Sequence, residues 1–459
     1  MTIKFKLTVI NFLEFFVWGA WLITFANYWF GTKQWDGSQF GLIFSTMGIA
    51  SLFMPTITGI IADRWINAEK LYGILHILYG VTLIYLTRVN NPDTFFWVML
   101  IAMCCYMPTI ALNNSISYNI LKNNGFDVIK DFPPIRVWGT VGFIVAMWLT
   151  NLTGNKATAF QFYIGGFSAI TLGFLSFALP ACVPQRNISS NAKWTEQLGL
   201  NAFKLFKNYK IALFLIFSMF LGAALQLTNM YGDLFIDEFK YFPKYADSII
   251  VEKSTLIMSI SQISETVFIL AIPFFLRRFG IKTVMLFSMF AWVLRFGLFA
   301  FGDPGTGLWM IVMSCIVYGF AFDFFNISGS LFIETNTAPS IRSSAQGLFM
   351  MMTNGVGAIF GSYTSGKMID LFFTESFTNI QGLATYLKTE VTNEHLLHLL
   401  AERNIQFNSD GTLSRIVTMK HWPEIWMTFA AYSLVVAIFF AIFFKHKHDP
   451  NALPKELGH

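Results

Sequence analysis

The sequence contains few charged residues. Only 12% of its 459 residues are Asp, Glu, Lys or Arg, whereas soluble domains carry about a quarter. The four cysteines have no paired spacing in loops, which argues against a disulfide framework or a cysteine metal site; they are Cys104, Cys105, Cys182 and Cys315. No basic patch interleaved with base-stacking aromatic residues lies outside the apolar runs, so the net charge of +5 does not indicate nucleic-acid binding. We therefore expect neither a soluble domain nor a nucleic-acid partner.

Motifs typical of catalysis are also missing. The sequence has no HExxH motif, and Ser328 lies in the string NISGS, which does not match the GxSxG motif of a nucleophile elbow. We therefore expect no enzyme activity, no metal and no cofactor. A membrane sensor without transport is not favoured either, because the loops leave no room for a soluble output domain.

Apolar and aromatic residues dominate the composition. Hydrophobic residues make up 55% of the chain, the mean hydropathy is +0.55, and there are 52 Phe and 13 Trp. This predicts a large apolar exterior with aromatic belts at the membrane interfaces. A spanning helix needs about 20 mostly apolar residues. The sequence therefore predicts an all-α membrane protein with twelve spans, at 7–30, 38–62, 70–88, 94–118, 134–153, 160–183, 211–235, 250–276, 283–302, 308–332, 344–370 and 424–444.

The first apolar run resembles a signal peptide at its start, because Lys4 and Lys6 precede it. It continues past Phe30, contains Glu14 and lacks a small-residue cleavage site, so we interpret it as a retained first helix. Lys and Arg are concentrated in the loops that are cytoplasmic if the N-terminus is inside, and an even number of spans then places both termini in the cytoplasm.

The longest inner connection divides the chain into two sets of six spans. The predicted parts are an N-terminal bundle over 1–183, a cytoplasmic linker over 184–210, and a C-terminal bundle over 211–459 with a long outer loop at about 371–423. The linker is compatible with a helix on the membrane surface or with a solvated connection. The strings PPIR, ending at Arg136, and PSIR, ending at Arg342, open corresponding helices in the two sets. This repeat favours a duplicated, pseudo-symmetric six-helix unit.

Four predicted spans place polar or aromatic side chains at neighbouring positions on one helical face. Polar pairs in membrane helices often only join helices to each other. Because these four come from both halves and differ in chemistry, they favour a central polar cavity instead. The residues are Arg136, Thr140 and Phe143; Gln226 and Asn229; Gln262 and Glu265; and Tyr318, Phe322 and Asp323.

These side-chain types indicate the ligand. Amides offer donors and acceptors together, which suits the edge of a heterocyclic base, and the aromatic rings offer faces for stacking. Glu265 and Asp323 can accept paired hydrogen bonds from vicinal hydroxyls, while Arg136 can balance their charge. A phosphorylated ligand would need more inward-facing cations. The pattern therefore predicts a neutral, hydroxylated, aromatic solute.

The carboxylates also indicate an energy source. A carboxylate at bilayer depth is costly, so Glu265 and Asp323 are our candidates for proton coupling. Glu14 is the next candidate, but it lies about two turns into its span and is equally compatible with a side chain that reaches the interface. His76 is expected to be packed and hydrogen-bonded rather than to carry a proton. Arg295 is expected to be a structural partner or to reach toward the interface.

The string GIIADRW, from Gly59 to Trp65, resembles the loop 2–3 signature of the major facilitator superfamily, although the glycine and paired basic residues that usually follow are absent. The resemblance implies a gating role for Asp63 and Arg64, in which they hold the two halves together on the inner side. A plain charged turn is the alternative.

A resemblance to the bacterial nucleoside–proton symporters covers almost the whole chain. It rests on the strings FPPIRVWGTVGFI, NMYGDLFI, IMSISQISETVFIL, YGFAFDFFNISGS and SAQGLFMMMTNGVG. It implies proton-driven uptake of purine and pyrimidine nucleosides across the inner membrane by alternating access, with the ten residues of the four polar faces as substrate site. We expect a monomer in the lipid bilayer. The alternative is a proton-coupled sugar or oligosaccharide symporter.

Overall fold

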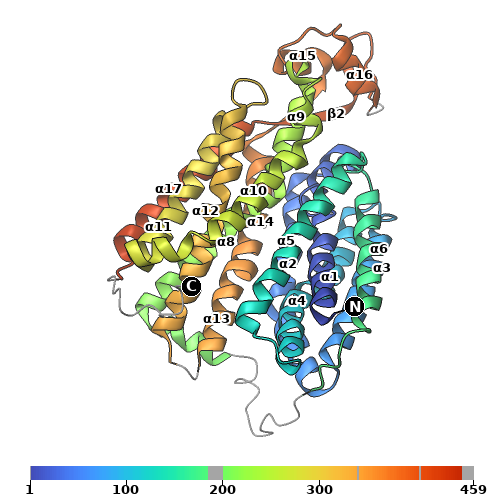
Figure 1. Cartoon of the computed structure of the whole chain (residues 1–459). Coiled ribbons are helices and arrows are strands. Elements are labelled where there is room, and N and C mark those ends of the chain that lie inside the picture. The colour runs from blue at the N-terminus through green and yellow to red at the C-terminus, as the bar shows by residue number, and fades with distance from the viewer. Residues whose placement is uncertain (1, 185–199, 339–340, 403–404, 447–459) are drawn as a thin grey trace.

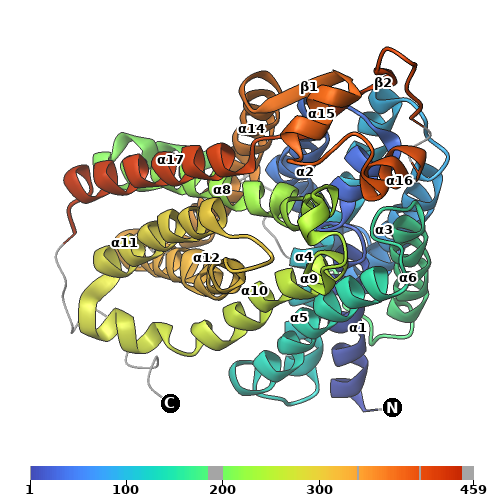
Figure 2. The ribbon, with the colours of Figure 1, turned by 90° about the horizontal axis from the view of Figure 1, so that it is seen from above.

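The computed structural model describes residues 2–184, 200–338, 341–402 and 405–446. Two bundles of long helices lie side by side, the first in blue to teal and the second in green to red (Figure 1). The view from above shows the same separation (Figure 2). Residues 185–199 of the predicted linker lie outside the described residues, and its last part forms the 3₁₀ helix η2, Leu200–Lys207.

The N-terminal bundle contains the first six predicted spans. Its helices are α1 (Ile3–Gly19), which is followed by the π-helical segment η1 (Asn27–Lys33), α2 (Gly37–Arg64), α3 (Ala68–Leu86), α4 (Pro92–Asn123), α5 (Val128–Leu152) and α6 (Phe160–Ser176). The C-terminal bundle contains α8 (Tyr209–Asp237), α10 (Ser254–Ile269), α11 (Ile272–Phe301), α12 (Leu308–Asn336), α13 (Arg342–Met350), the π-helical segment η6 (Met351–Gly357), α14 (Ala358–Phe372) and α17 (Trp422–Phe443).

Seven helices of the described residues are long and apolar enough to cross a membrane alone. Several other predicted spans are built from pieces. Leu270 and Ala271 keep helical dihedral angles between α10 and α11, whereas Gly280 has φ 76° and ψ 166°. Residues 272–279 therefore extend α10, and residues 281–301 form the next span. In the same way, α13, η6 and α14 follow one another along the predicted span 344–370.

The long predicted loop before the last helix folds into a small domain of its own. It contains β1 (Thr374–Asn379), α15 (Ile380–Tyr386), α16 (Glu394–Glu402) and β2 (Thr412–Lys420). The strands pair antiparallel, with Phe377 opposite Val417. Leu396 and Leu400 of α16 are buried in a separate apolar core with these strands. These two strands are the exception to the all-α prediction. We call this unit the cap domain, and the end of the bundles that carries it the capped end.

The bundles touch each other closely where α2 packs against η6 and α14. A Cβ atom added to Gly41 would lie 2.3 Å from the backbone oxygen of Ser362, and one added to Gly48 would lie 2.6 Å from that of Gly355. Glycine at these positions lets the two backbones approach each other. A second contact joins α5 to α10, where the Trp148 indole N–H donates to Ser259 Oγ at 2.9 Å.

Candidate functional site

The four predicted polar faces lie on α5, α8, α10 and α12. Helix α10 packs against α5 of the other bundle and against α8 and α12 of its own. The charges of Arg136, Glu265 and Asp323 lie close enough to act on one another. Arg136 belongs to the N-terminal bundle and the two carboxyl groups to the C-terminal bundle, so this interaction between charges crosses the interface of the bundles.

Two aromatic residues form a flat surface on α12. The rings of Tyr318 and Phe322 are 6.1 Å apart and inclined by only 9°. Trp292 packs edge-on against Tyr318, and the Arg295 guanidinium lies 4.6 Å from the centre of the Tyr318 ring. Arg295 is fully buried and donates to the backbone oxygen of Ser314 at 2.6 Å. It is therefore a structural partner of the aromatic surface and does not reach toward the interface.

Three predicted residues have buried polar atoms without a hydrogen-bond partner among the described residues. These atoms are Gln226 Oε1, Gln262 Oε1 and Asp323 Oδ2. Buried polar atoms are normally satisfied, because an unsatisfied one costs about 1–3 kcal/mol. They lie on α8, α10 and α12, so each of these three helices has an oxygen that could accept a hydrogen bond from a ligand. Asn229 and Thr140 are half-buried on α8 and α5.

The wall from the N-terminal bundle includes two residues that the sequence reasoning missed. The Arg136 guanidinium lies 4.1 Å from the centre of the Phe15 ring. Trp18 packs edge-on against Phe143 at 6.1 Å, and its Nε1 has no partner among the described side chains and backbone. Trp18 lies four residues after Glu14, so the two side chains share one face of α1. This spacing could have predicted that α1 also contributes to the site.

Glu14 and His76 form a buried pair. Both side chains are fully buried, and His76 Nε2 lies 2.8 Å from Glu14 Oε2. The interpretation of Glu14 as a residue that reaches the membrane interface is therefore wrong. The prediction that His76 is packed and hydrogen-bonded is confirmed.

Asp63 and Arg64 lie at the end of α2 that is remote from the capped end. Asp63 is exposed and Arg64 is half-buried. Across the described residues, neither side chain has an ion pair or hydrogen bond to the other bundle. Their predicted gating role stays a prediction.

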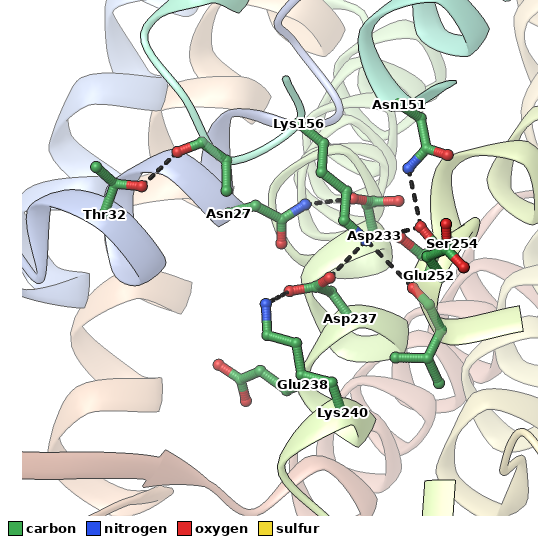
Figure 3. A network of polar contacts seen from close by, with 12 residues as sticks. Asn27, Thr32, Asn151, Lys156, Asp233, Asp237, Glu238, Lys240, Glu252 and Ser254 are labelled. Atoms are coloured by element: carbon green, nitrogen blue, oxygen red, sulfur yellow. Dashed lines mark hydrogen bonds and ion pairs between the residues drawn. The ribbon is translucent and has the colours of Figure 1, made fainter. Parts of the chain in front are cut away.

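Polar contacts between the bundles gather at the capped end (Figure 3). Lys156, which follows α5, forms an ion pair with Asp237 of α8 at 2.5 Å. Its Nζ also donates to Ser254 Oγ at 3.1 Å and to two backbone oxygens near the end of α9 (Ile249–Glu252), each at 3.2 Å. Asn27 donates to Asp233 at 2.5 Å. One lysine therefore joins the first bundle to the second through four acceptors.

A cavity of about 280 Å³ lies beside these contacts. Its walls come from both bundles and from the cap domain, and include Phe30, Trp35, Asp237, Asp370 and Lys420. Lys420 is buried, pairs with Glu238 at 3.2 Å, and lies 3.9 Å from the centre of the Phe30 ring. The cap domain is thus tied to the C-terminal bundle and touches the N-terminal bundle.

Comparisons with known proteins agree with this arrangement. A model of the family described as "Nucleoside H+ symporter" matches residues 1–401. Nucleoside permease NupG of Escherichia coli (strain K12) is 45% identical over 449 residues, which cover 98% of this chain and 97% of NupG. Xanthosine permease of the same organism is 44% identical over 454 residues, which cover 99% of this chain and 98% of that protein.

The fold is also similar to that of a solved structure. The crystal structure of nucleoside transporter NupG, in a D323A mutant, matches with a TM-score of 0.84 and 44% identity, and the match covers 97% of this chain and 100% of that one. This confirms the predicted fold class, two six-helix bundles of the major facilitator type. Together with the family match, it shows that the chain is a transporter and belongs to the nucleoside H+ symporter family.

Proposed function

We propose that this symporter binds its nucleoside between the bundles, at the residues of α5, α8, α10 and α12 named above. The observation that carries the proposal is the set of three unsatisfied buried atoms on Gln226, Gln262 and Asp323. A nucleoside base can supply donors to the two amides, and ribose hydroxyls can donate to the carboxyl group. The parallel rings of Tyr318 and Phe322 suit stacking of the base.

The names of the relatives support nucleosides as the substrate class, and a broad purine and pyrimidine range is part of this proposal. Uptake of labelled uridine and adenosine into vesicles, with and without a pH gradient, tests it. We expect the labelled nucleoside to accumulate only when the outside is the acidic side. Excess unlabelled nucleoside should suppress this accumulation, whereas excess sugar should not. Inhibition by sugars without inhibition by nucleosides would contradict the proposal.

The proposed location is the bacterial inner membrane, with the capped end outside and both termini in the cytoplasm. The distribution of Lys and Arg between loops supports this orientation. Large apolar side chains on the outer surface, among them Leu270 at 81% exposure and Phe372 at 75%, support direct contact with lipid. We propose that a single chain is the transporting unit, because the site lies between the two bundles of one chain.

The proposed conformation is closed toward the outside. Lys156→Ala should weaken this closure, because it removes four contacts between the bundles at once. Leu234 lines the cavity at the capped end, so a cysteine placed there reports on access from this end. In a background without native cysteines, Leu234→Cys should react several-fold faster with an impermeant maleimide when Lys156 is replaced by Ala. Lys240→Ala is the matched control, since Lys240 pairs with the same Asp237 from within its own bundle. Equal acceleration in both variants would contradict a closing role of Lys156.

Phe322→Ala should weaken nucleoside binding. Loss of stacking is expected to cost about 1–3 kcal/mol, by analogy with bases on aromatic side chains. Calorimetric titration of the purified protein with uridine measures the change. Phe290→Ala removes a ring that is 46% exposed on the outer surface of α11, and it should leave the affinity unchanged. Unaltered affinity in the Phe322 variant would remove this residue from the site.

A further inference from the structure

The start of α2 is held by a side chain from the other bundle. Asp370, two residues before the end of α14, accepts the Gly37 N–H at 3.1 Å and also accepts the Ser38 N–H. Gly37 and Ser38 are the first two residues of α2, and such N–H groups have no acceptor within their own helix. The C-terminal bundle therefore supplies the acceptor for a helix start of the N-terminal bundle.

The position of Asp370 is not explained by its own helix. A carboxylate near the C-terminal end of a helix is unfavourable, because the free carbonyl groups give that end a partial negative charge. The N-terminal end of α2 carries a partial positive charge, which stabilises the same carboxylate. A Cβ atom at Gly366, one turn before Asp370, would lie 2.7 Å from the Gly37 backbone oxygen, so the absence of a side chain there permits the contact. Asp370 therefore stabilises the close approach of α14 to α2.

Asp36, which directly precedes α2, is the residue that would ordinarily provide this acceptor. It occupies the N-cap position with φ −71° and ψ 151°, and its backbone oxygen accepts the Phe40 N–H at 3.1 Å. Aspartate is among the preferred N-cap residues, and its side chain normally accepts the N–H of the second or third helical residue. The exposed Asp36 side chain makes no such bond. The N–H of Ser38, the second helical residue, is instead bound by Asp370.

Two carboxylates are thus available to one helix start, and only one of them belongs to the same bundle. When α14 moves away from α2, the Gly37 and Ser38 N–H groups lose the Asp370 carboxylate. Asp36 moves with α2, and its backbone already has the extended conformation of an N-cap residue. Rotation of its side chain can therefore supply a new acceptor. Both carboxylates line the cavity at the capped end, which leaves room for this rotation.

We propose that Asp370 and Asp36 are gating residues that exchange as the acceptor for the start of α2 during transport. Asp370 serves while the capped end is closed, and Asp36 serves while it is open. Each carboxylate therefore stabilises a different state, and removal of one shifts the population toward the state that the other stabilises. This inference rests on the proposed function for its effect on uptake, but the exchange of acceptors does not depend on the identity of the substrate.

Maleimide labelling of Leu234→Cys in the purified full-length protein, without native cysteines and without nucleoside, tests the exchange. Asp370→Ala should raise the labelling rate about fivefold, the population shift expected from loss of one typical helix N-cap. Asp36→Ala should lower the rate by a similar factor, because only the open state loses its acceptor. In the double variant both states lose their acceptors, and the rate should return close to that of the parent.

Two control variants distinguish this exchange from a general loss of stability. Asp303 accepts the Gly305 N–H at 2.7 Å and the Gly307 N–H at 3.2 Å just before α12, so it serves a helix start within the C-terminal bundle alone. Asp303→Ala should therefore leave the labelling rate unchanged. Asp36→Asn keeps a side-chain oxygen that suits the N-cap position, and it should retain the parental rate.

Gly37→Ala replaces the Asp370 variant if that variant does not fold. Its Cβ atom would lie 2.2 Å from Asp370 Oδ1 and would displace the carboxylate, so faster labelling is again expected. An unchanged rate in either single variant, or a shift of both in the same direction, would overturn the proposal. Failure of the parent to transport uridine would overturn the proposed function, while the labelling rates would still decide whether the acceptors exchange.

Discussion

Asp323→Asn and Glu265→Gln are each expected to abolish the accumulation of nucleoside against its gradient. Asp323 is 5% exposed, and both carboxyl groups lie within reach of the Arg136 charge. A carboxyl group that transports a proton must be able to lose it, and the amide that replaces it cannot. Without the exchange of a proton, the gradient no longer drives transport. Proteoliposomes with an acidic exterior measure this as the ratio of internal to external uridine.

The same variants should separate coupling from binding. Equilibrium exchange of labelled uridine is expected to persist at least in Glu265→Gln, because the amide can still hydrogen-bond a ribose hydroxyl. Glu334→Gln serves as control: this carboxylate forms a half-exposed ion pair with Arg342 at the far end of α12. Near-normal accumulation in both the Asp323 and Glu265 variants would remove them as the coupling residues.

Gly41→Leu is expected to stop transport with the capped end held open. A Cβ atom at Gly41 would lie 2.3 Å from the Ser362 oxygen, closer than real Cβ atoms approach other atoms, and 3.1 Å from Gly366 Cα, which is also a tight contact. Overpacking of this kind costs about 1–3 kcal/mol or more. Here the strain is relieved when α2 and α14 separate, so the open state is favoured.

The rate of maleimide labelling at Leu234→Cys should therefore rise strongly with Gly41→Leu, while uridine uptake falls close to background. Gly297→Leu is the control, because a Cβ atom at Gly297 of α11 meets nothing within 4 Å. Loss of uptake without any gain in labelling would indicate misfolding or a different blocked state. The expression level and thermal stability of each variant distinguish these two outcomes.

Local sequence patterns predicted much of the fold. Apolar runs located the spans, and the repeat around Arg136 and Arg342 indicated two halves. The internal breaks were harder to predict, because Gly280 resembles any other glycine between apolar segments until its positive φ is observed. The cap domain was missed for a related reason. Its core joins Phe377, Leu396 and Val417 across about forty residues, and helical periodicity does not reveal such contacts.

In the site, too, contacts within one helix could be predicted from the sequence, whereas contacts between helices could not. Gln262 and Glu265 are neighbours on one helix, so their spacing alone indicated a shared face. Glu14 and His76 come from different helices, and each alone had an ordinary explanation. Phe15 and Trp18 are aromatic residues in an aromatic-rich helix, and only their contacts with Arg136 and Phe143 distinguish them.

The cap domain is attached unequally to the two bundles. Lys420 is paired with Glu238 of the second bundle, yet it rests on Phe30 of the first. When the bundles separate, an ion pair holds the lysine on one side, while the ring on the other side can slide away from it. If the solute enters from this end, as proposed above, it passes a wall that moves with the C-terminal bundle only, because the cap domain is fixed to that bundle by the ion pair.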